Sequence, residues 1–255
     1  MVFTKSLVRT FIRMLAWRAF TWAENLNDTR MEQNGEDLFL AHLPEAEPFV
    51  FFDVGANMGE YSLSLLKRFP KAEGHLFEPS SECLKNLHSL FAEQPQILVN
   101  DCALSDAVGE AMLWFDHPGS ALASLYKRDL KEYSLELNES QAVRTTTLES
   151  YIETKKVGHV NLLKVDVEGH ELRVLEGAGR YLSPEFLDCI QFEYGGCDLD
   201  SMTSLRSLYR LLEGRGFEMY KIMPGGLLKR GYRPFMENFQ YSNYVAASPK
   251  LELKL

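Results

Sequence analysis

Acidic side chains and glycines alternate at one place in this 255-residue chain in a way that suits a charged ligand. In FVFFDVGANMG, residues 49–59, Asp53 directly precedes a turn that contains Gly55, Asn57 and Gly59. Glycines let such a turn bend sharply and let its backbone approach a ligand. A carboxylate beside the turn would repel a pyrophosphate and attract an ammonium group. The pattern therefore favours S-adenosylmethionine, which carries an α-amino group and a sulfonium, over a dinucleotide.

Glu78 extends this predicted cofactor site. It lies 19 residues after Gly59 and ends the short apolar run 74–77. The spacing corresponds to one strand–helix–strand step, at the end of which a carboxylate can accept hydrogen bonds from both ribose hydroxyls. An ordinary tight turn would explain the glycines but not both carboxylates.

A third predicted strand, residues 97–103, ends in the polar pair Asn100 and Asp101. If this strand continues the same parallel sheet, its carboxyl end lies at the edge where ligands bind. We therefore expect Asn100 and Asp101 to face the adenine of the cofactor.

A second group of ionisable residues supplies candidate catalytic residues: Asp166, Glu168, His170 and Glu193. Asp166 and Glu193 each end a predicted buried strand, whereas Glu168 and His170 lie in the turn after Asp166. Methyl transfer to a hydroxyl needs a base, and a positioned base contributes about 10²- to 10⁴-fold. Alternatively, the carboxylates and the histidine could bind magnesium or manganese, which would lower the pKa of the hydroxyl. Glu171 is expected only to cap a helix or orient the loop.

Residues 116–141 form a long irregular segment between two β-rich runs, 110–115 and 143–148, which we expect to pair as antiparallel strands. A segment of this length without periodicity is either an active-site lid or a plain surface insertion. The candidate substrate contacts in it are Ser120, Ser124, Tyr126, Lys127 and Arg128.

The elements around these residues follow an α/β pattern. Predicted buried strands recur at residues 49–52, 74–77, 97–103, 161–165 and 188–192, with amphipathic stretches such as 60–69 between them. With 45% hydrophobic and 25% charged residues, the chain can bury one large core. A net charge of -9 argues against a nucleic-acid partner. Four cysteines without a CxxC pair indicate reduced thiols and a cytoplasmic enzyme.

Residues 1–32 differ from the predicted enzyme domain at 33–255. Within residues 1–27, four basic residues alternate with aliphatic and aromatic ones, which predicts a basic amphipathic helix. The charges are too frequent for a transmembrane span, and the apolar core of a signal peptide is missing. The helix could pack on the domain, form a homodimer interface or attach to the inner membrane surface. Residues 33–40 predict a connecting turn and the start of a helix.

The motifs FDVGANMGEYS, LFEP, CALSD, VRTTTLESY, LLKVDVEGHELRVLEG and IQFEYG together resemble the FkbM family of S-adenosylmethionine-dependent methyltransferases. The resemblance covers residues 33–220. It implies a Rossmann-like class I methyltransferase fold, a mostly parallel seven-stranded sheet with flanking helices and a reversed last strand, 243–248, after the strand 217–223.

The resemblance also implies roles for individual residues. Asp53, Gly55, Asn57 and Glu78 match the family's cofactor residues, and Asp166 matches its acidic residue near the acceptor. The family implies O-methylation of sugars and natural products.

The sequence thus predicts an O-methyltransferase that acts on a hydroxyl of a sugar, as a small-molecule or glycan acceptor in a nucleotide sugar or a surface-glycan precursor. Three alternatives remain. The acceptor could be a lipid, a peptide amine or a phosphorus-linked group, because cofactor residues do not specify it. The chain could be an NAD-dependent oxidoreductase, which Asp53 and Asn57 disfavour. It could also be a catalytically inactive module that binds membranes.

Overall fold

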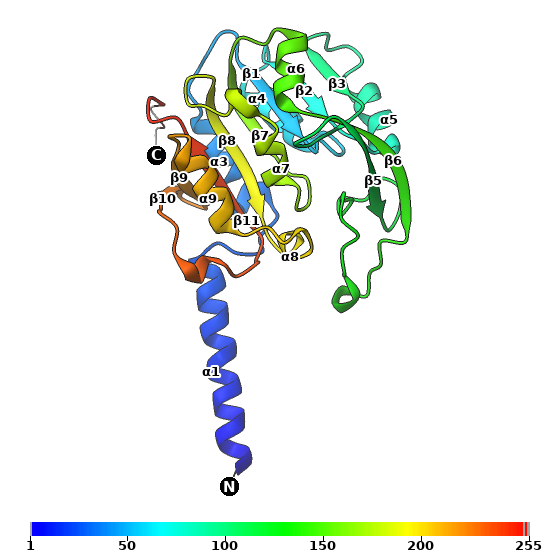
Figure 1. The fold of residues 1–255 in the computed structure, drawn as a ribbon. Helices are drawn as coiled ribbons and strands as arrows, with labels where there is room; N and C mark the ends of the chain where they lie inside the picture. The colour runs from blue at the N-terminus through cyan, green and yellow to red at the C-terminus, as the bar shows by residue number, and fades with distance from the viewer. Residues whose placement is uncertain (1, 252, 254–255) are drawn as a thin grey trace.

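The computed structural model describes residues 2–251 and 253, with side chains from residue 7 onward except those of the undescribed residues. Met1, residues 254–255 and the side chains of Phe3 and Lys5, which the sequence assigned to the N-terminal helix and the enzyme domain, lie outside the described part. The chain forms a large sheet covered by helices, a small second sheet beside it, and one helix that projects from the domain (Figure 1).

The large sheet is mostly parallel, and its strand order confirms the fold that the resemblance implies. β3, β2, β1, β7 and β8 run parallel to one another, and β11 inserts antiparallel between β8 and β9 as the reversed last strand. The seven expected strands are present, and a hairpin adds an eighth, β10, at the edge of β9. The order across the sheet is β10 (Gly226–Lys229), β9 (Glu218–Met223), β11 (Ser242–Ala247), β8 (Leu187–Tyr194), β7 (Val160–Val165), β1 (Val50–Val54), β2 (Glu73–Phe77) and β3 (Ile97–Asn100).

The central strands are apolar on both faces because helices cover both sides of the sheet. In β1, for example, Phe51 packs into the core on one face and Phe52 into the core on the other, as the alternation of side chains along a strand requires. The helices α3 (Glu36–His42), α4 (Glu60–Arg68) and α5 (Ser81–Leu90) contribute to the first core. The helices α6 (Leu148–Lys155), α7 (Glu171–Glu176) and α9 (Leu205–Gly214) contribute to the second.

A second sheet of three strands lies beside the edge strand β3. Its order is β4 (Ala103–Leu104), β6 (Glu139–Thr146) and β5 (Gly109–Phe115). β5 and β6 pair antiparallel, which confirms the predicted pairing. The predicted strand 97–103 is wrong in extent, because a turn in which the N–H of Cys102 donates to the carbonyl of Asn100 divides it between the two sheets.

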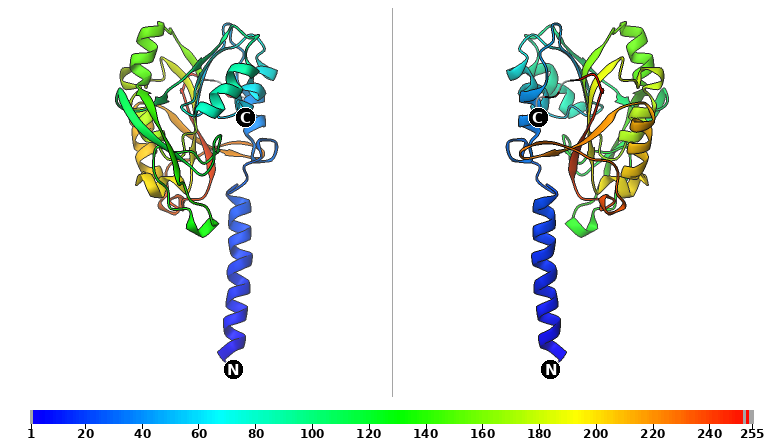
Figure 2. Two further views of the ribbon diagram at one scale, coloured as in Figure 1. Left: turned by 90° about the vertical axis from the view of Figure 1, so that its right-hand side faces the viewer. Right: turned by 90° about the vertical axis from the view of Figure 1, so that its left-hand side faces the viewer.

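The N-terminal helix α1 (Val2–Ala23) stands away from the domain in all three views (Figures 1 and 2). Most of its described apolar side chains are exposed, among them Leu7 at 69% and Trp22 at 85%, whereas Phe20 near its end is partly buried. Packing of the whole helix on its own domain, one of the three alternatives, is therefore wrong. The end of the helix is attached through Glu24, which pairs with Arg230 at 2.6 Å, and through Asn25, which donates to the carbonyl of Ile222 at 3.0 Å. Within the described residues, no helix is both long and apolar enough to cross a bilayer.

Between α1 and β1 the chain makes the predicted turn and helix. Gly35 separates α2 (Met31–Asn34) from α3, and its φ of +99° is one that L side chains rarely adopt. A Cβ at Gly35 would lie 2.1 Å from the carbonyl oxygen of Met223. The position therefore requires glycine for two reasons, its backbone angle and the close approach of β9.

We predict that Gly35→Ala lowers the free energy of unfolding by about 2 to 4 kcal/mol, because backbone strain and overpacking add. Gly225→Ala is the matched control, since no atom lies within 4 Å of the added Cβ and its φ is ordinary. The control should change stability by less than about 0.5 kcal/mol. Urea denaturation of both variants checks this. Equal midpoints for the two variants would contradict the close approach of β9.

Candidate active site

A cavity of about 1330 Å³ opens at the carboxyl edge of the large sheet. Its walls include the residues that follow β1, β2, β7 and β8 and the long segment between β5 and β6. Typical small-molecule sites occupy about 300 to 1,000 Å³. The cavity therefore has room for a cofactor and a second molecule. Ligands of parallel α/β sheets bind at this edge, so the location agrees with the sequence prediction.

The glycine-rich turn after β1 forms one wall of the cavity. Gly55 and Asn57 line it, with φ values of +81° and 45°. A Cβ at Gly55 would lie 1.8 Å from the carbonyl oxygen of Asp166, so this glycine allows the ends of β1 and β7 to meet. Gly59, predicted to bind the cofactor, does not line the cavity; it begins α4, and a Cβ there would press on Leu87. For Gly59 the predicted approach to a ligand is therefore wrong, whereas Gly55 lines the cavity and its approach to the cofactor stays a prediction.

Glu78 lies directly after β2 on the cavity wall. Its two carboxylate oxygens accept hydrogen bonds from the backbone N–H groups of Asn57 at 2.8 Å and Ser80 at 2.7 Å. Each oxygen keeps lone pairs for further donors. Burial raises the pKa of Glu78 to about 7 although both N–H bonds favour the ionised form. The carboxylate of Glu78 can therefore still accept hydrogen bonds from a ribose, as predicted.

Asp53 is placed differently from the prediction. It belongs to β1, is fully buried and does not line the cavity, so its carboxylate does not project from the edge toward an ammonium group. One oxygen accepts a 2.6 Å hydrogen bond from Ser62, and the other lies 4.0 Å from the ammonium of Lys164 and has no hydrogen-bond partner. Burial raises the pKa of Asp53, and Lys164 opposes that shift.

The prediction that Asn100 and Asp101 face the adenine is also wrong, because neither residue lines the cavity. The Asn100 amide donates to two backbone carbonyls of the sheet, and Asp101 is exposed and pairs with Arg144 at 3.2 Å. The apolar side chains that line the cavity near Glu78 include Leu104 and Leu113, from the small sheet. We expect them to contact the adenine. Sequence reasoning missed them because it continued β3 through residue 103.

Three of the four candidate catalytic residues meet at one point of the cavity. Asp166, Glu168 and Glu193 each offer an oxygen, and these atoms lie within 4.8 Å of one another. The ammonium of Lys164 donates to Asp166 at 2.9 Å. Burial, opposed by its ion pair with Arg128, raises the pKa of Glu168 to about 7. Burial and the neighbouring carboxylates raise the pKa of Glu193 well above its usual value. Binding of a proton or a cation at the cluster is therefore favourable, because either one offsets the repulsion among the carboxylates.

His170 is separate from this cluster. Its Nε2 lies 2.9 Å from the hydroxyl of Ser105 and its Nδ1 lies 3.1 Å from that of Tyr126, so both ring nitrogens are occupied. Burial lowers the pKa of His170 to about 4. His170 is therefore a weak base, and it does not join the other three candidate catalytic residues. Glu171 fulfils its expected role, because its carboxylate accepts from two backbone N–H groups of the turn.

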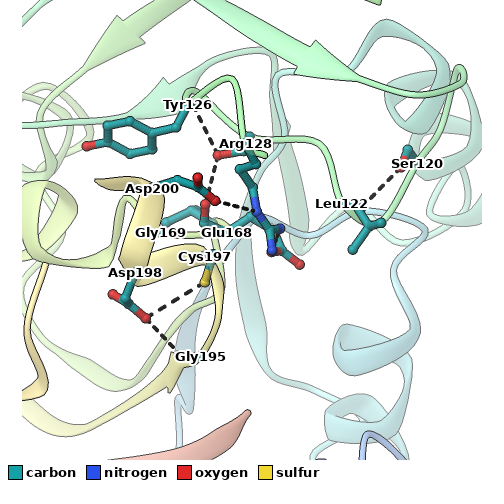
Figure 3. Close-up of polar contacts among 12 residues, drawn as sticks. Ser120, Leu122, Tyr126, Arg128, Glu168, Gly169, Gly195, Cys197, Asp198 and Asp200 are labelled. Carbon is teal, nitrogen blue, oxygen red and sulfur yellow. Dashed lines mark hydrogen bonds and ion pairs between the residues drawn. The ribbon is translucent and has the colours of Figure 1, made fainter. Parts of the chain in front are cut away.

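The segment between β5 and β6 brings Arg128 to Glu168, a member of the acidic cluster (Figure 3). Arg128 pairs with Glu168 and lies 3.6 Å from Asp200, which joins this segment to the residues that follow β7 and β8. The hydroxyl of Ser124 donates to the carbonyl of Glu168 at 2.7 Å. The segment is thus a wall of the cavity, and the plain surface insertion is wrong.

Only some of the predicted substrate contacts lie in this wall. Ser120, Ser124 and Arg128 line the cavity. Tyr126 and Lys127 do not line it. Tyr126 contacts His170, and the ammonium of Lys127 lies 4.7 Å from the centre of the Trp114 ring. The prediction that Tyr126 and Lys127 contact the substrate directly is therefore wrong.

Comparison with known proteins follows this geometry. The family model described as Methyltransferase FkbM domain matches residues 53–219, which include the turn after β1 and the acidic cluster. The chain belongs to the FkbM methyltransferase family.

Curated relatives of this FkbM domain differ in what their names say they act on. The hexuronic acid methyltransferase AglP of Haloferax volcanii is 27% identical over 187 residues, which cover 73% of this chain and 72% of AglP. The 31-O-demethyl-FK506 methyltransferase FkbM of Streptomyces tacrolimicus is 28% identical over 205 residues, which cover 70% of this chain and 76% of that protein. The methyltransferase sdnD of Sordaria araneosa is 29% identical over 164 residues, 54% of this chain and 62% of sdnD, so the match spans less than two thirds of that relative.

The cavity of this FkbM domain is strongly acidic. Its basic lining residues are Arg128 and Lys164, with two histidines besides. A methyl donor with a sulfonium and an ammonium suits these surroundings, and an NAD pyrophosphate does not. The acidic residues that line the cavity are Glu36, Glu60, Glu78, Asp116, Asp129, Glu132, Asp166, Glu168, Glu193 and Asp200.

Sequence reasoning missed Lys164 as a site residue. It is 8% exposed, lies among Asp53 and Asp166, and its ammonium is 4.8 Å from the centre of the Tyr61 ring. These carboxylates raise its pKa despite burial. A signal was present in the sequence, because Lys164 is the lone charge within a mostly apolar strand.

We predict that S-adenosylhomocysteine binds about tenfold more tightly at pH 8 than at pH 6. The ribose hydroxyls donate to the ionised form of Glu78, whose pKa of about 7 in the free protein leaves it mostly protonated at pH 6. Glu78→Gln should weaken binding at pH 8 by about tenfold or more and flatten the pH profile. Calorimetric titration measures both effects.

Glu82→Gln is the control, because that carboxylate is exposed and pairs with Lys85 outside the cavity. It should keep the wild-type profile. A wild-type affinity that falls with rising pH, or a Glu78→Gln profile as steep as that of the wild type, would remove Glu78 from the ribose site.

A further prediction concerns the segment that covers the cluster. Arg128→Met should raise amide hydrogen exchange in residues 118–138 by about tenfold or more, because it removes the ion pairs that hold the segment. Lys127→Met removes the adjacent charge, which is exposed, and should leave exchange nearly unchanged. Equal exchange in the two variants would show that other contacts hold the segment.

Proposed function

We propose that this FkbM domain transfers the methyl group of S-adenosylmethionine to a hydroxyl of a sugar. One observation carries the proposal: three carboxylates, those of Asp166, Glu168 and Glu193, converge in the same cavity as the glycine-rich turn and Glu78. The turn and Glu78 would hold the cofactor, and the carboxylates would prepare the acceptor hydroxyl.

In the proposed reaction the acceptor oxygen attacks the methyl carbon as the carbon–sulfur bond breaks, and S-adenosylhomocysteine leaves. A carboxylate takes the hydroxyl proton as the new carbon–oxygen bond forms. Asp166 is the nearest candidate to Lys164, which holds it in place at 2.9 Å. Glu193 is the second candidate because its carboxylate lies in the same cluster as that of Asp166, whereas both ring nitrogens of His170 are occupied by Ser105 and Tyr126.

A divalent cation fits the same residues. Carboxylate oxygens are hard ligands of the kind that magnesium and manganese prefer, and the three oxygens are close enough to share one ion. Asp166, Glu168 and Glu193 would hold it, and the ion would lower the pKa of the acceptor hydroxyl. Glu168 would then exchange its pairing with Arg128 for the ion.

The lining of the cavity and the names of the relatives support a sugar as the acceptor. A polyol can donate several hydrogen bonds to a wall rich in carboxylates, which favours a sugar over an apolar acceptor. AglP is named for a hexuronic acid and FkbM of Streptomyces tacrolimicus for 31-O-demethyl-FK506, so both names are consistent with an oxygen acceptor. A nucleotide sugar or other anionic acceptor would need a cation to offset the acidic wall.

We predict that Asp166→Asn lowers turnover by at least about a hundredfold while the affinity for S-adenosylhomocysteine stays within about threefold of the wild type. The exchange keeps the shape of the side chain and removes its charge. Asp101→Asn is the matched control, because that carboxylate is 61% exposed and outside the cavity. Methyl transfer from labelled S-adenosylmethionine measures turnover.

The acceptors in this assay should be neutral hexoses, hexuronic acids, nucleotide sugars and a non-sugar alcohol, each with and without a chelator. Inactivation that magnesium or manganese reverses supports the cation, whereas indifference to the chelator supports direct base catalysis. Near-normal turnover of Asp166→Asn contradicts its role. Methylation of the non-sugar alcohol and of none of the sugars would contradict the proposal that the acceptor is a sugar.

A further inference from the structure

The helix α1 carries exposed apolar side chains that no part of its own domain covers. Val8, Phe11 and Leu15 are 58%, 57% and 52% exposed, and Trp22 is 85% exposed. Their spacing of three, four and seven residues places these four side chains on one side of the helix. Exposed apolar surface of this extent indicates an interaction site.

The opposite side of the helix carries arginines together with Trp17, which is 49% exposed. Arg9 and Arg13 are four residues apart on that side, and no ion pair found among the described residues involves them. Arg18 lies toward the apolar side, where its long stem lets the guanidinium reach past the apolar surface to a polar layer. The helix thus presents apolar and cationic surfaces together.

Charge is divided sharply between this helix and the remainder of the protein. Residues 2–23 contain Lys5, Arg9, Arg13 and Arg18 and no acidic residue, a net charge of +4. The whole chain has a net charge of -9, so the remainder carries -13. A second copy of the helix would bring like charges together, whereas an anionic surface complements the helix and repels the domain.

We propose that α1 binds an anionic phospholipid surface, with Val8, Phe11, Leu15 and Trp22 at the acyl boundary and the arginines among the headgroups. Basic helices with tryptophan and large aliphatic residues lie in the plane of such interfaces. Attraction of the arginines to anionic lipids adds to burial of the apolar side chains.

This attachment would place the cavity near the lipid. Asn27, Thr29 and Met31, just beyond the end of α1, line the cavity rim. Figure 1 shows that α1 leaves the domain at the end where β8 runs into the short helix α8 (Cys197–Ser201), which is the carboxyl edge of the sheet. The arrangement suits an acceptor presented at a membrane surface.

The test is co-sedimentation of the full chain with vesicles of phosphatidylglycerol and phosphatidylcholine in equal parts, and with vesicles of phosphatidylcholine alone. We expect binding to the anionic vesicles, little binding to the neutral ones and loss of binding at high salt. Arg9→Gln with Arg13→Gln should weaken partitioning about thirtyfold. Phe11→Ser with Leu15→Ser should weaken it by at least about tenfold.

The matched control for the arginine pair is Arg206→Gln with Arg210→Gln, which removes two exposed charges four residues apart on α9. The control for the apolar pair is Val108→Ser, at a side chain 69% exposed on the domain. Both controls should bind anionic vesicles as the wild type does. Circular dichroism confirms that the variants keep their helix content.

Equal binding to neutral and anionic vesicles, or no binding to either, would overturn the proposal. A dimer in light scattering that Phe11→Ser with Leu15→Ser converts to a monomer, without binding to vesicles, would assign the helix to a second copy instead. None of these results depends on methyl transfer, so they separate this proposal from the proposed function.

Discussion

The active edge of the sheet depends on one buried ammonium group. Lys164 lies opposite Asp53 in the parallel pairing of β7 with β1, and its ammonium reaches Asp166 at 2.9 Å and Asp53 at 4.0 Å. Removing one partner of such a buried set leaves an uncompensated charge, at a cost of about 3 to 5 kcal/mol. Lys164 therefore makes the buried Asp53 tolerable and also positions Asp166 at the cavity. The ammonium of Lys164 thus contributes both to the stability of the sheet and to the position of a candidate catalytic residue.

A second polar network ties the beginning of the domain to this edge. The carboxylate of Glu36 accepts from the side-chain amides of Asn34 and Gln191, each at 2.6 Å, and the hydroxyl of Tyr61 donates to Gln191 at 2.6 Å. Burial raises the pKa of Glu36. Through these bonds α2, α3, α4 and β8 hold one another, so the segment that follows α1 is held rigidly against the cavity.

The two turns that carry the site each contain left-handed backbone conformations. Asn57 and Glu168 are non-glycine residues with positive φ, 45° and 54°. The backbone N–H of Asn57 donates to the carboxylate of Glu78, and the side chain of Glu168 pairs with Arg128. Gly169 follows with a φ of +102°, where a Cβ would lie 2.8 Å from the carbonyl of Cys197. Such conformations persist only where surrounding contacts determine them, which is typical of functional turns.

Local sequence was sufficient for most of the central strands and for the turns that follow them. The apolar runs before Asp53 and Asp166 predicted buried strands, and the turn residues after them predicted a ligand edge, because strand propensity and turn chemistry act over a few neighbouring residues. The same local information placed Glu78 one strand–helix–strand step further on, where the structure has it at the cavity wall.

Tertiary structure alone decided which of these side chains face the cavity. Asp53 is buried against Lys164, His170 is occupied by Ser105 and Tyr126, and Asn100 points into the sheet. Each outcome depends on the pairing of segments far apart in the chain, which brings partners and burial that no short pattern contains. The same holds for α1: its sequence determined a basic helix with an apolar side, but only the folded domain shows that this side remains uncovered.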